Sequence, residues 1–227
     1  MIMNTTAIDR VILTCVRHAQ IENATSLAKL NGRLLTMKER KALVRASINH
    51  GLVEQSRDLA KLTFGRALSK KECACLIAVN VRTGHMVNAA KAAALISRAL
   101  TQKEIEQIIR VSVNRGRIGI LIDAPRVCNR TLESKELNRL GINCLNRGNY
   151  AAALEVVKTG KAEVCVTNML LKVSLRIADL KTALQAAIFL NRALKTSELQ
   201  LLINKCIRKN DLENAIQASR LLNCTTD

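Results

Sequence analysis

A repeat of about 32 residues runs through the chain, and it constrains the fold more than any other feature of the sequence. An arginine followed two residues later by a leucine marks the boundary between units. The motif occurs at Arg33-Leu34-Leu35, Arg66-Ala67-Leu68, Arg98-Ala99-Leu100, Arg130-Thr131-Leu132 and Arg192-Ala193-Leu194. Its spacing, which doubles once, predicts seven units over approximately residues 3–34, 35–67, 68–99, 100–131, 132–161, 162–193 and 194–227.

Two columns of equivalent residues support this register. Large apolar residues lie eight positions after each unit start, at Val11, Leu43, Leu76, Ile108, Leu140, Leu170 and Leu202. Small or flexible residues lie sixteen positions after it, at Ala19, Gly51, Gly84, Gly116, Gly148, Ala178 and Asn210. Glycine and asparagine tolerate the left-handed backbone that ends many helices. The second column therefore predicts the end of a first helix in every unit.

Several units begin with the pattern of a helix N-terminus. Thr36 with Glu39, Ser69 with Glu72, and Thr101 with Glu104 have the spacing of capping boxes. A second, alanine-rich helix follows the glycine column in each unit. One such hairpin cannot bury its apolar face, whereas stacked hairpins can. The sequence thus predicts an all-α protein, an α-solenoid of about seven stacked helix-turn-helix repeats of 30–33 residues in a single domain over 1–227.

Composition excludes other classes of protein. Apolar residues make up 48% of the chain, but Phe64, Phe189 and Tyr150 are its only aromatic residues and Pro125 is its only proline. Disordered chains are less apolar, and β-sandwiches need aromatic, β-branched strands with frequent turns. No apolar run approaches the ~18 residues of a membrane span, and no leader segment is recognisable, so we expect a cytoplasmic protein.

Two segments resemble known helical repeats. The stretch Gly148-Asn149-Tyr150-Ala151-Ala152-Ala153-Leu154 has the Gly-x-Tyr-x-x-Ala spacing of tetratricopeptide repeats, and Glu198 to Leu222 is similar to a pentatricopeptide repeat. The tetratricopeptide resemblance implies binding of peptides and proteins. The pentatricopeptide resemblance implies sequence-guided binding of single-stranded RNA, with a basic residue near the end of each first helix contacting phosphate.

The charge distribution favours the second implication. Lysine and arginine number 36 against 18 Asp and Glu, a formal net charge of +18. Cations recur beside the glycine column, at Arg17, Arg82, Arg115, Arg147, Arg176, Arg208 and Lys209, and in the second helices, at Lys61, Arg126, Lys158 and Arg220. Cations at a helix end also stabilise the helix dipole, so the first row has a structural explanation too. Aligned rows with few acids between them favour a polyanion, and we interpret them as candidate nucleic-acid-binding residues.

Three further rows complete the pattern. Lysines share one position of the first helix at Lys38, Lys71, Lys103 and Lys135. The arginines of the repeat motif are interpreted as structural, with their stems packed between units. The capping glutamates Glu39, Glu72, Glu104, Glu136 and Glu198 lie in the same helices and would repel phosphate if they were exposed beside it.

RNA or another nucleic acid is therefore the expected partner, bound by a scaffold, chaperone or regulator. The residues that would select bases by the pentatricopeptide resemblance are Arg10, Ala42, Cys75, Gln107, Arg139, Met169 and Leu201. Few of them can hydrogen-bond a base edge, which predicts binding through the phosphate backbone. The alternative is a tetratricopeptide-like module for an acidic peptide or protein. No basic amphipathic helix indicates a membrane surface, and apolar residues in the first and last units leave end-to-end self-association open.

Catalytic and metal-binding patterns are missing from the sequence. No Cys-x-x-Cys pair, phosphate-binding loop or paired carboxylate motif occurs, and the three histidines are dispersed. Cys15, Cys144 and Cys206 share a column with serine and asparagine, so we interpret them as reduced, packed thiols. We expect a binding protein without enzymatic activity, cofactor or metal. Gly119 and Pro125 in the fourth unit predict an irregular second helix.

Overall fold

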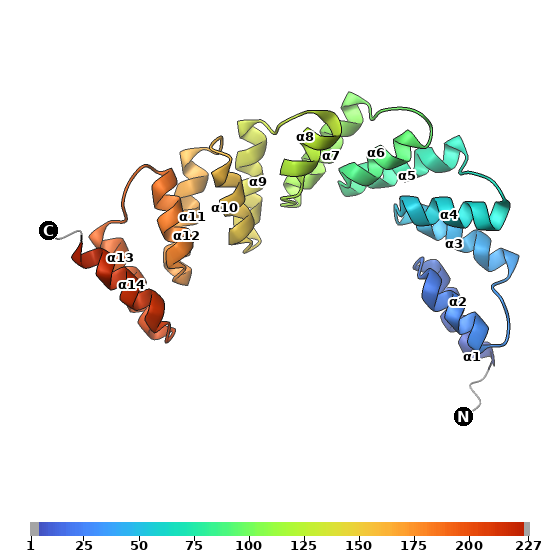
Figure 1. Cartoon of the computed structure of the whole chain (residues 1–227), viewed down its shortest axis with the longest axis horizontal. Coiled ribbons are helices and arrows are strands. Elements are labelled where there is room, and N and C mark those ends of the chain that lie inside the picture. Colours follow the sequence, from blue (N-terminus) through green and yellow to red (C-terminus); the bar gives the residue numbers. More distant parts are fainter. Residues whose placement is uncertain (1–4, 225–227) are drawn as a thin grey trace. The chain divides into compact units, whose positions relative to one another are not determined.

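The computed structural model describes residues 5–224, with side chains from residue 7 onward, and this part of the chain contains helices and no strands (Figure 1). The first helices of the hairpins are α1 (Thr5–Arg17), α3 (Met37–Asn49), α5 (Lys70–Thr83), α7 (Gln102–Asn114), α9 (Ser134–Asn146), α11 (Val164–Ile177) and α13 (Thr196–Arg208). The second helices are α2 (Ile21–Leu30), α4 (Val53–Phe64), α6 (Met86–Ala94), α8 (Ile120–Cys128), α10 (Tyr150–Lys158), α12 (Leu180–Phe189) and α14 (Leu212–Asn223). The predicted all-α repeat architecture is confirmed.

Two compact units divide the chain, residues 1–111 and residues 112–227, and the division lies within α7. In the first unit, α1, α3 and α5 pack side by side, and each packs against the second helix of its own hairpin. In the second unit, α9, α11 and α13 do the same with α10, α12 and α14. The expectation of one domain over 1–227 stays a prediction.

The predicted helix ends coincide with left-handed backbone in all seven hairpins. The column from Ala19 to Asn210 has φ values between 55° and 79°. Gly51 shows why this position is restricted, because a Cβ there would lie 3.0 Å from the side-chain amide of Asn80 in the next hairpin. A second set of left-handed residues ends the second helices, at Gly32, Gly65, Ser97, Asn129, Gly160 and Asn191. In the first six hairpins, a residue with positive φ therefore follows both the first and the second helix.

Part of the core lies between consecutive first helices, and the buried alanines of the second helices form the rest. Leu43, Leu76, Ile108, Leu140, Leu170 and Leu202 of the apolar column are each at most 1% exposed. Val11 departs from the column and is 45% exposed, since no described hairpin precedes α1 to cover it. The predicted apolar column thus marks the surface on which one hairpin packs against the hairpin before it.

A polar column links consecutive hairpins through the backbone. Cys15, Ser47, Asn80, Ser112, Cys144, Ser174 and Cys206 are all buried, which confirms a packing position. Asn80 donates to the carbonyl of Gly51 at 3.1 Å, and Cys144 donates to the carbonyl of Gly116 at 3.6 Å. Burial raises the pKa of the Cys144 thiol, which keeps it protonated as a donor.

The fourth hairpin departs from the others, as the sequence predicts. Its second helix begins at Ile120, four residues after Gly116, whereas the other second helices begin two residues after the equivalent position. Pro125 lies inside this nine-residue helix. Because proline lacks an N–H group, the helix loses one backbone hydrogen bond at this point.

Candidate nucleic-acid interface

The helix-end cations lie at the carboxyl ends of the odd-numbered helices. Arg17 and Arg208 are the last residues of α1 and α13, and Arg82 and Arg176 lie in the last turns of α5 and α11. Arg115, Arg147 and Lys209 each follow their helix by one residue. All seven side chains are exposed.

Four of these cations, Arg17, Arg82, Arg176 and Arg208, belong to a larger exposed surface, whereas Arg115, Arg147 and Lys209 lie just beyond it. The second, sixth, ninth and thirteenth residues of an α-helix lie on one face because they are spaced by four, three and four residues. We call this face of the odd-numbered helices the basic stripe. Its members are Arg10, Leu13 and Arg17 in α1; Lys38, Ala42, Arg45 and Asn49 in α3; Lys71, Cys75, Ala78 and Arg82 in α5; Lys103, Gln107, Arg110 and Asn114 in α7; Lys135, Arg139, Ile142 and Asn146 in α9; Cys165, Met169, Lys172 and Arg176 in α11; and Ser197, Leu201, Asn204 and Arg208 in α13.

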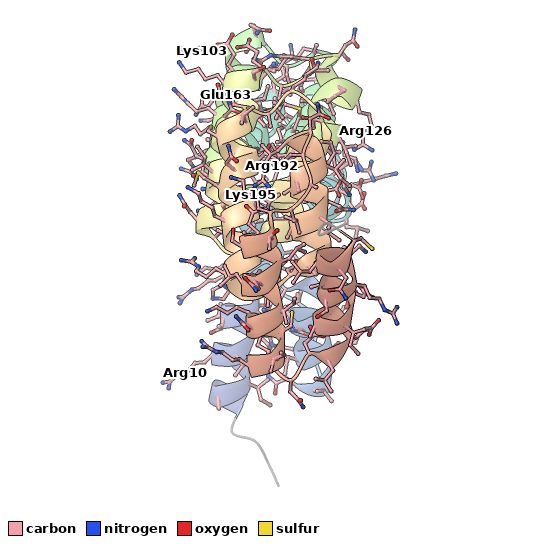
Figure 2. The ribbon with its side chains drawn as sticks, turned by 90° about the vertical axis from the view of Figure 1, so that its left-hand side faces the viewer. Arg10, Lys103, Arg126, Glu163, Arg192 and Lys195 are labelled. Carbon is pink, nitrogen blue, oxygen red and sulfur yellow. The ribbon has the colours of Figure 1, made fainter. Side chains whose placement is uncertain are left out.

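The basic stripe contains cations and neutral residues and, among these members, no Asp or Glu. All of its members are exposed except Ala42, Gln107 and Ile142, which are half-buried. Arg10 and Lys103, both in the first unit, project outward from the ribbon on the same side (Figure 2). The stripe includes Arg45, Arg110 and Lys172, which sequence reasoning missed. The signal for Arg45 and Arg110 was their position seven residues after Lys38 and Lys103.

Within the first unit, neighbouring stripes line one hollow. Stripe residues line part of a cavity of about 590 Å³: Asn49 of α3, Cys75, Ala78 and Arg82 of α5, and Gln107 of α7. Arg98 and Glu104, which pair with each other, line it as well. This volume lies in the range of about 300–1,000 Å³ that is typical of ligand sites. The structure therefore brings a helix-end arginine and two predicted base-selecting residues, Cys75 and Gln107, to the same cavity.

The acids of the odd-numbered helices are held by arginines of the preceding connection. Arg33 pairs with Glu39, Arg66 with Glu72, Arg98 with Glu104, Arg130 with Glu136 and Arg192 with Glu198, at 2.7–2.9 Å. We call each pair an Arg–Glu clasp. The arginines of the repeat motif thus hold the helix-capping glutamates, a pairing that sequence reasoning missed, and each of these glutamates carries its own counter-ion. The repulsion of phosphate expected from these glutamates is reduced accordingly.

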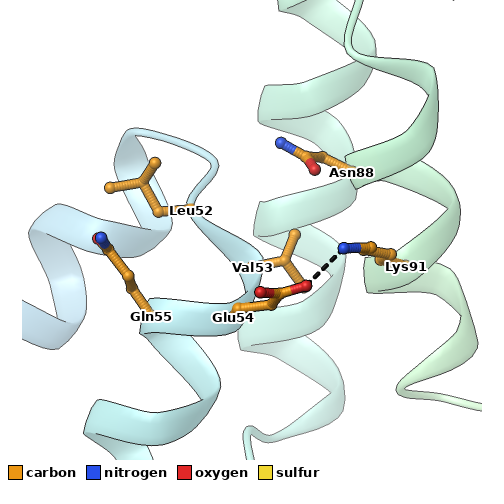
Figure 3. A pocket seen from close by; sticks show the side chains of 6 residues that line it. All are labelled: Leu52, Val53, Glu54, Gln55, Asn88 and Lys91. Atoms are coloured by element: carbon orange, nitrogen blue, oxygen red, sulfur yellow. Dashed lines mark hydrogen bonds and ion pairs between the residues drawn. The ribbon is translucent and has the colours of Figure 1, made fainter.

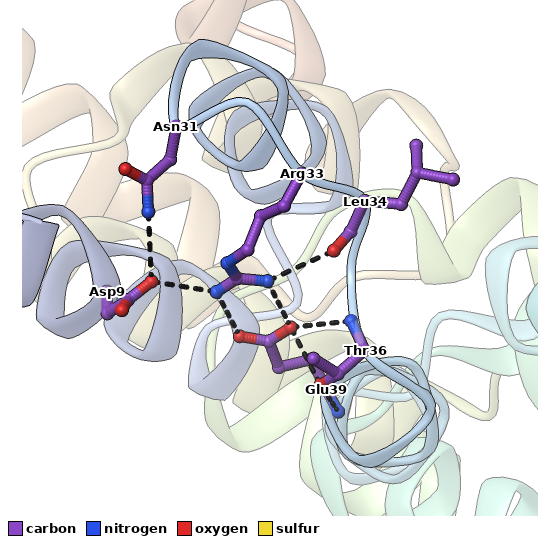
Figure 4. A network of polar contacts seen from close by, with 6 residues as sticks. All are labelled: Asp9, Asn31, Arg33, Leu34, Thr36 and Glu39. Atoms are coloured by element: carbon purple, nitrogen blue, oxygen red, sulfur yellow. Dashed lines mark hydrogen bonds and ion pairs between the residues drawn. The ribbon is translucent and has the colours of Figure 1, made fainter.

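The clasp at Arg33 illustrates the geometry (Figure 4). Arg33 donates through Nη1 and Nη2 to the two carboxylate oxygens of Glu39 at 2.9 and 2.8 Å, and its Nη2 also donates to Asp9 at 2.8 Å. The backbone N–H of Thr36 donates to Glu39 Oε2 at 2.7 Å, which completes the predicted capping box. The hydrogen bonds from Arg33 lower the pKa of Glu39 to about 2, and those to Glu39 raise the pKa of Arg33.

The sixth hairpin replaces the clasp with another arrangement. Val166 occupies the glutamate position of α11, and the connection before this helix is one residue shorter, with Lys161 after the left-handed Gly160. In a hairpin with a clasp, the backbone N–H at this position donates to the capping glutamate. Here the backbone N–H of Glu163 donates instead to Oδ1 of Asn138 in α9, at 2.7 Å. Both members of the clasp are therefore lost together, and no glutamate is left without its arginine.

The even-numbered helices carry a smaller excess of positive charge than the odd-numbered helices. The odd-numbered helices carry seventeen Lys and Arg residues and seven Asp and Glu residues, and five of these acids are in clasps. The even-numbered helices carry eight Lys and Arg residues and six Asp and Glu residues. Among the predicted binding residues, Lys158 pairs with Glu155 at 2.7 Å and Arg126 with Asp123 at 3.3 Å. Lys91 of α6 likewise reaches Glu54 of α4 (Figure 3). Lys61 and Arg220 are exposed without an ion pair among the described residues.

Two helix-end cations have structural contacts as well. Lys209 donates to the carbonyl of Ile177 in the preceding hairpin at 2.5 Å, so it caps the carboxyl end of α11. Arg115 lies near the half-buried Arg117, and burial together with this neighbouring cation lowers the pKa of Arg117. The helix-dipole explanation thus applies directly to Lys209.

The described part of the chain contains no disulfide, no metal-binding cluster and no membrane-spanning helix. All eight cysteines are free thiols, and no cluster of His, Cys, Asp and Glu there could hold a metal ion. None of the described helices has the length and hydropathy of a membrane span. Comparison of the chain with protein-family models, curated proteins and solved structures gives no match in any of the three.

Proposed function

We propose that the protein binds RNA, or nucleic acid broadly, along the basic stripe. It contacts the phosphate backbone and acts as a scaffold, chaperone or regulator without enzymatic activity or cofactor. The observation that carries this proposal is a stripe of cations and neutral residues that contains no acid. In the first unit its residues line a hollow across three helices, and the one acid in that hollow, Glu104, is paired with Arg98.

Total charge alone would not support this choice of surface. The clasps occupy five arginines and five glutamates, so their charges cancel locally. The remaining excess of cations lies mainly on the odd-numbered helices. Lysine and arginine that contact phosphate release condensed counterions, which is the main source of affinity for a nucleic acid without sequence preference.

The central positions of the stripe favour weak sequence preference. They are the base-selecting positions implied by the pentatricopeptide resemblance, and Arg10, Gln107 and Arg139 are the members that can hydrogen-bond a base edge. Exposed Met169 and Leu201 offer apolar contacts instead. Asn49, Asn114 and Asn146 at the thirteenth position add neutral donors and acceptors beside the cations.

The test compares two triple variants of equal charge. Lys71, Arg82 and Arg110 of the stripe are changed to Gln in one, and Lys29, Lys61 and Arg220 of the even-numbered helices are changed to Gln in the other. Binding of a short single-stranded RNA is measured between 50 and 200 mM salt, roughly the range over which phosphate contacts weaken most visibly. Thermal unfolding of the same samples reports stability.

We expect the stripe variant to bind RNA several-fold more weakly and to flatten the salt slope by about 0.7 for each lost contact, with a near-native melting temperature. The even-helix variant should retain most of the affinity. Equal losses in both variants, or none in either, would contradict the proposal. Poly-glutamate serves as the acidic-polymer control, and tight binding to it with undetectable binding to RNA would favour the protein-binding alternative.

A further inference from the structure

The first described hairpin exposes the surface by which the later hairpins pack on the hairpin before them. Val11 of α1 is 45% exposed, whereas its equivalents in the other hairpins are at most 1% exposed. Cys15, one helical turn later, lies in the polar column that donates to carbonyls of the preceding hairpin. Ala7, one turn before Val11, is exposed and occupies the glutamate position of the clasps. We call Ala7, Val11 and Cys15 the leading face.

The last described hairpin exposes the opposite kind of surface. Ile207 of α13 is 56% exposed, whereas its equivalents in the other hairpins are at most 6% exposed. Ile203, one turn earlier, is half-buried, and its equivalents in the other hairpins are all buried. We call Ile203 and Ile207 the trailing face. Terminal repeats of solenoids usually have a polar outer face, and these two residues are apolar.

The two faces match each other in the register of the internal contacts. Gly141 of α9 has the position of Ile203, and Val166 of α11 has the position of Ala7. A Cβ on Gly141 would lie 2.6 Å from Val166, so these two positions of consecutive hairpins meet. That contact combines a missing side chain with a branched one, and Ile203 against Ala7 combines a large side chain with a small one. Both combinations conserve the total volume at the contact.

A junction between the two faces also leaves no charge without a partner. The clasp glutamate is replaced by Ala7, and Cys224 lies 32 residues after Arg192, at the arginine position of the last unit. Both members of the clasp are therefore missing where the faces would meet, as they are in the sixth hairpin. An unpaired glutamate at this place would be costly to bury.

We propose that the trailing face of one copy of the chain binds the leading face of a second copy. The contacts within each unit always join a leading surface to a trailing surface, so the contact between copies is heterologous and joins them in one direction. A second copy is the occupant that fits, because it carries the matching face in the same register. This inference does not depend on the basic stripe or on the proposed function.

Salt should affect this association and RNA binding in opposite directions. Each copy has a net charge of +18, so two copies repel each other, and salt screens this repulsion. The contact itself is apolar and is not weakened by screening. Association should therefore become stronger as the salt concentration rises, whereas phosphate contacts become weaker.

The experiment places one charge on each face separately. Val11→Lys changes the leading face, and Ile207→Lys changes the trailing face. Leu13→Lys and Leu201→Lys are matched controls, because these leucines lie on the same two helices, are 45% and 42% exposed, and belong to neither face. Sedimentation velocity of nuclease-treated protein is measured at rising concentration in about 0.1 M and about 1 M salt, between which the Debye length falls from about 10 Å to about 3 Å. Thermal unfolding confirms that each variant is folded.

We expect the unmodified chain and both controls to form larger species as the concentration rises, and more readily in high salt. Val11→Lys and Ile207→Lys should each stay monomeric alone. Their equimolar mixture should form a 1:1 dimer and nothing larger, because each variant supplies the intact face that the other lacks. Association of Val11→Lys by itself, a monomeric mixture, or an unmodified chain that stays monomeric would overturn the proposal.

Cross-linking of the unmodified chain decides the question even if a variant fails to fold. Equal amounts of ¹⁵N-labelled and unlabelled chain are mixed and treated with an amine cross-linker. Mass spectrometry should find cross-links between labelled and unlabelled copies that join Lys29 of the first hairpin to Lys195, which precedes α13 in the last. Cross-links between copies that join only last hairpins to each other, or none at all, would contradict the head-to-tail contact.

Discussion

At the scale of single residues, the Arg–Glu clasp is the most repeated polar contact of the molecule. Its glutamate caps a helix and binds an arginine at once, and its side chain is 10–25% exposed. Hydrogen bonds from the arginine lower the pKa of Glu39, Glu72 and Glu104 to about 2. A carboxyl group whose pKa is lower in the folded chain stabilises that chain above its unfolded pKa, about 4.5, and loses this contribution as the pH falls to about 2.

Replacing Glu104 with Gln should therefore destabilise the chain in a pH-dependent way. At pH 7 we expect a loss of about 1–2 kcal/mol in the free energy of unfolding, because Arg98 loses its charged carboxylate partner, while the amide oxygen of glutamine can still accept from the N–H of Thr101. The difference from the unmodified chain should shrink below pH 4.5 and be mostly lost near pH 2, where Glu104 is about half protonated in the folded chain. Urea unfolding over this pH range measures it.

Glu106→Gln is the matched control on the same helix. Glu106 is exposed and accepts a hydrogen bond from Gln102 at 3.0 Å, outside any clasp. Its replacement should change stability by less than about 0.5 kcal/mol at every pH. A pH-independent cost for Glu104→Gln, or an equal cost for both variants, would show that the clasp does not stabilise the fold.

At the scale of helices, the contact between α9 and α11 is packed differently from its counterparts. Gly141 of α9 stands in a column that holds Val44, Ile77, Ile109 and Leu171 elsewhere. A Cβ on Gly141 would lie 2.6 Å from Cγ1 of Val166, which is fully buried. The side chain of Val166 in α11 therefore occupies the space that a side chain at position 141 of α9 would fill.

A double-mutant cycle on this pair should show strong coupling. Gly141→Ala alone is expected to destabilise the second unit by about 1–2 kcal/mol, since the branched side chain of Val166 cannot move away. In the background of Val166→Ala, the same change should stabilise by up to about 1 kcal/mol through helix propensity. Thermal unfolding of the four proteins gives the coupling energy, and additive effects would contradict the packing described.

The repeat pattern was sufficient to predict the helices but not their partners. Left-handed residues and capping boxes are local, so Gly84 and the Thr36–Glu39 pair could be assigned from spacing alone. The lysine row beginning at Lys38 was also visible. The clasps and the stripe were harder to see, because a pairing six residues apart across a connection has no helical period. The contact between Gly141 and Val166 depends on packing between hairpins, which a single sequence does not specify.

At the scale of the whole molecule, the last described hairpin leaves an apolar face open. Ile207 and Leu212 are 56% and 60% exposed. Their equivalents in the preceding hairpin, Leu175 and Leu180, are 6% and 1% exposed. The position of Ile207 is buried in every hairpin that another hairpin follows, so the last face has the chemistry of a packing surface.

We expect this chain to self-associate through that face. Sedimentation velocity should show association that increases with protein concentration, and Leu212→Lys should abolish it without lowering the melting temperature. The control is Ile122→Lys, because Ile122 of α8 is 69% exposed. A monomer at all concentrations, or equal effects of the two lysines, would rule out association by the last hairpin.

The position of the clasps also bears on how such a chain lengthens by gene duplication. Each clasp joins an arginine at the end of one unit to a glutamate at the start of the next. When such a unit is duplicated or removed, the two units that become neighbours therefore form a clasp at their new junction. The junction between the units of α9 and α11, at Gly141, Val166 and Asn138, is different. Either of these two units, if it were placed beside a unit with the clasp residues, would bring a steric clash or an unpaired polar group. We therefore expect an exchange of these two units together to be tolerated better than an exchange of either one alone.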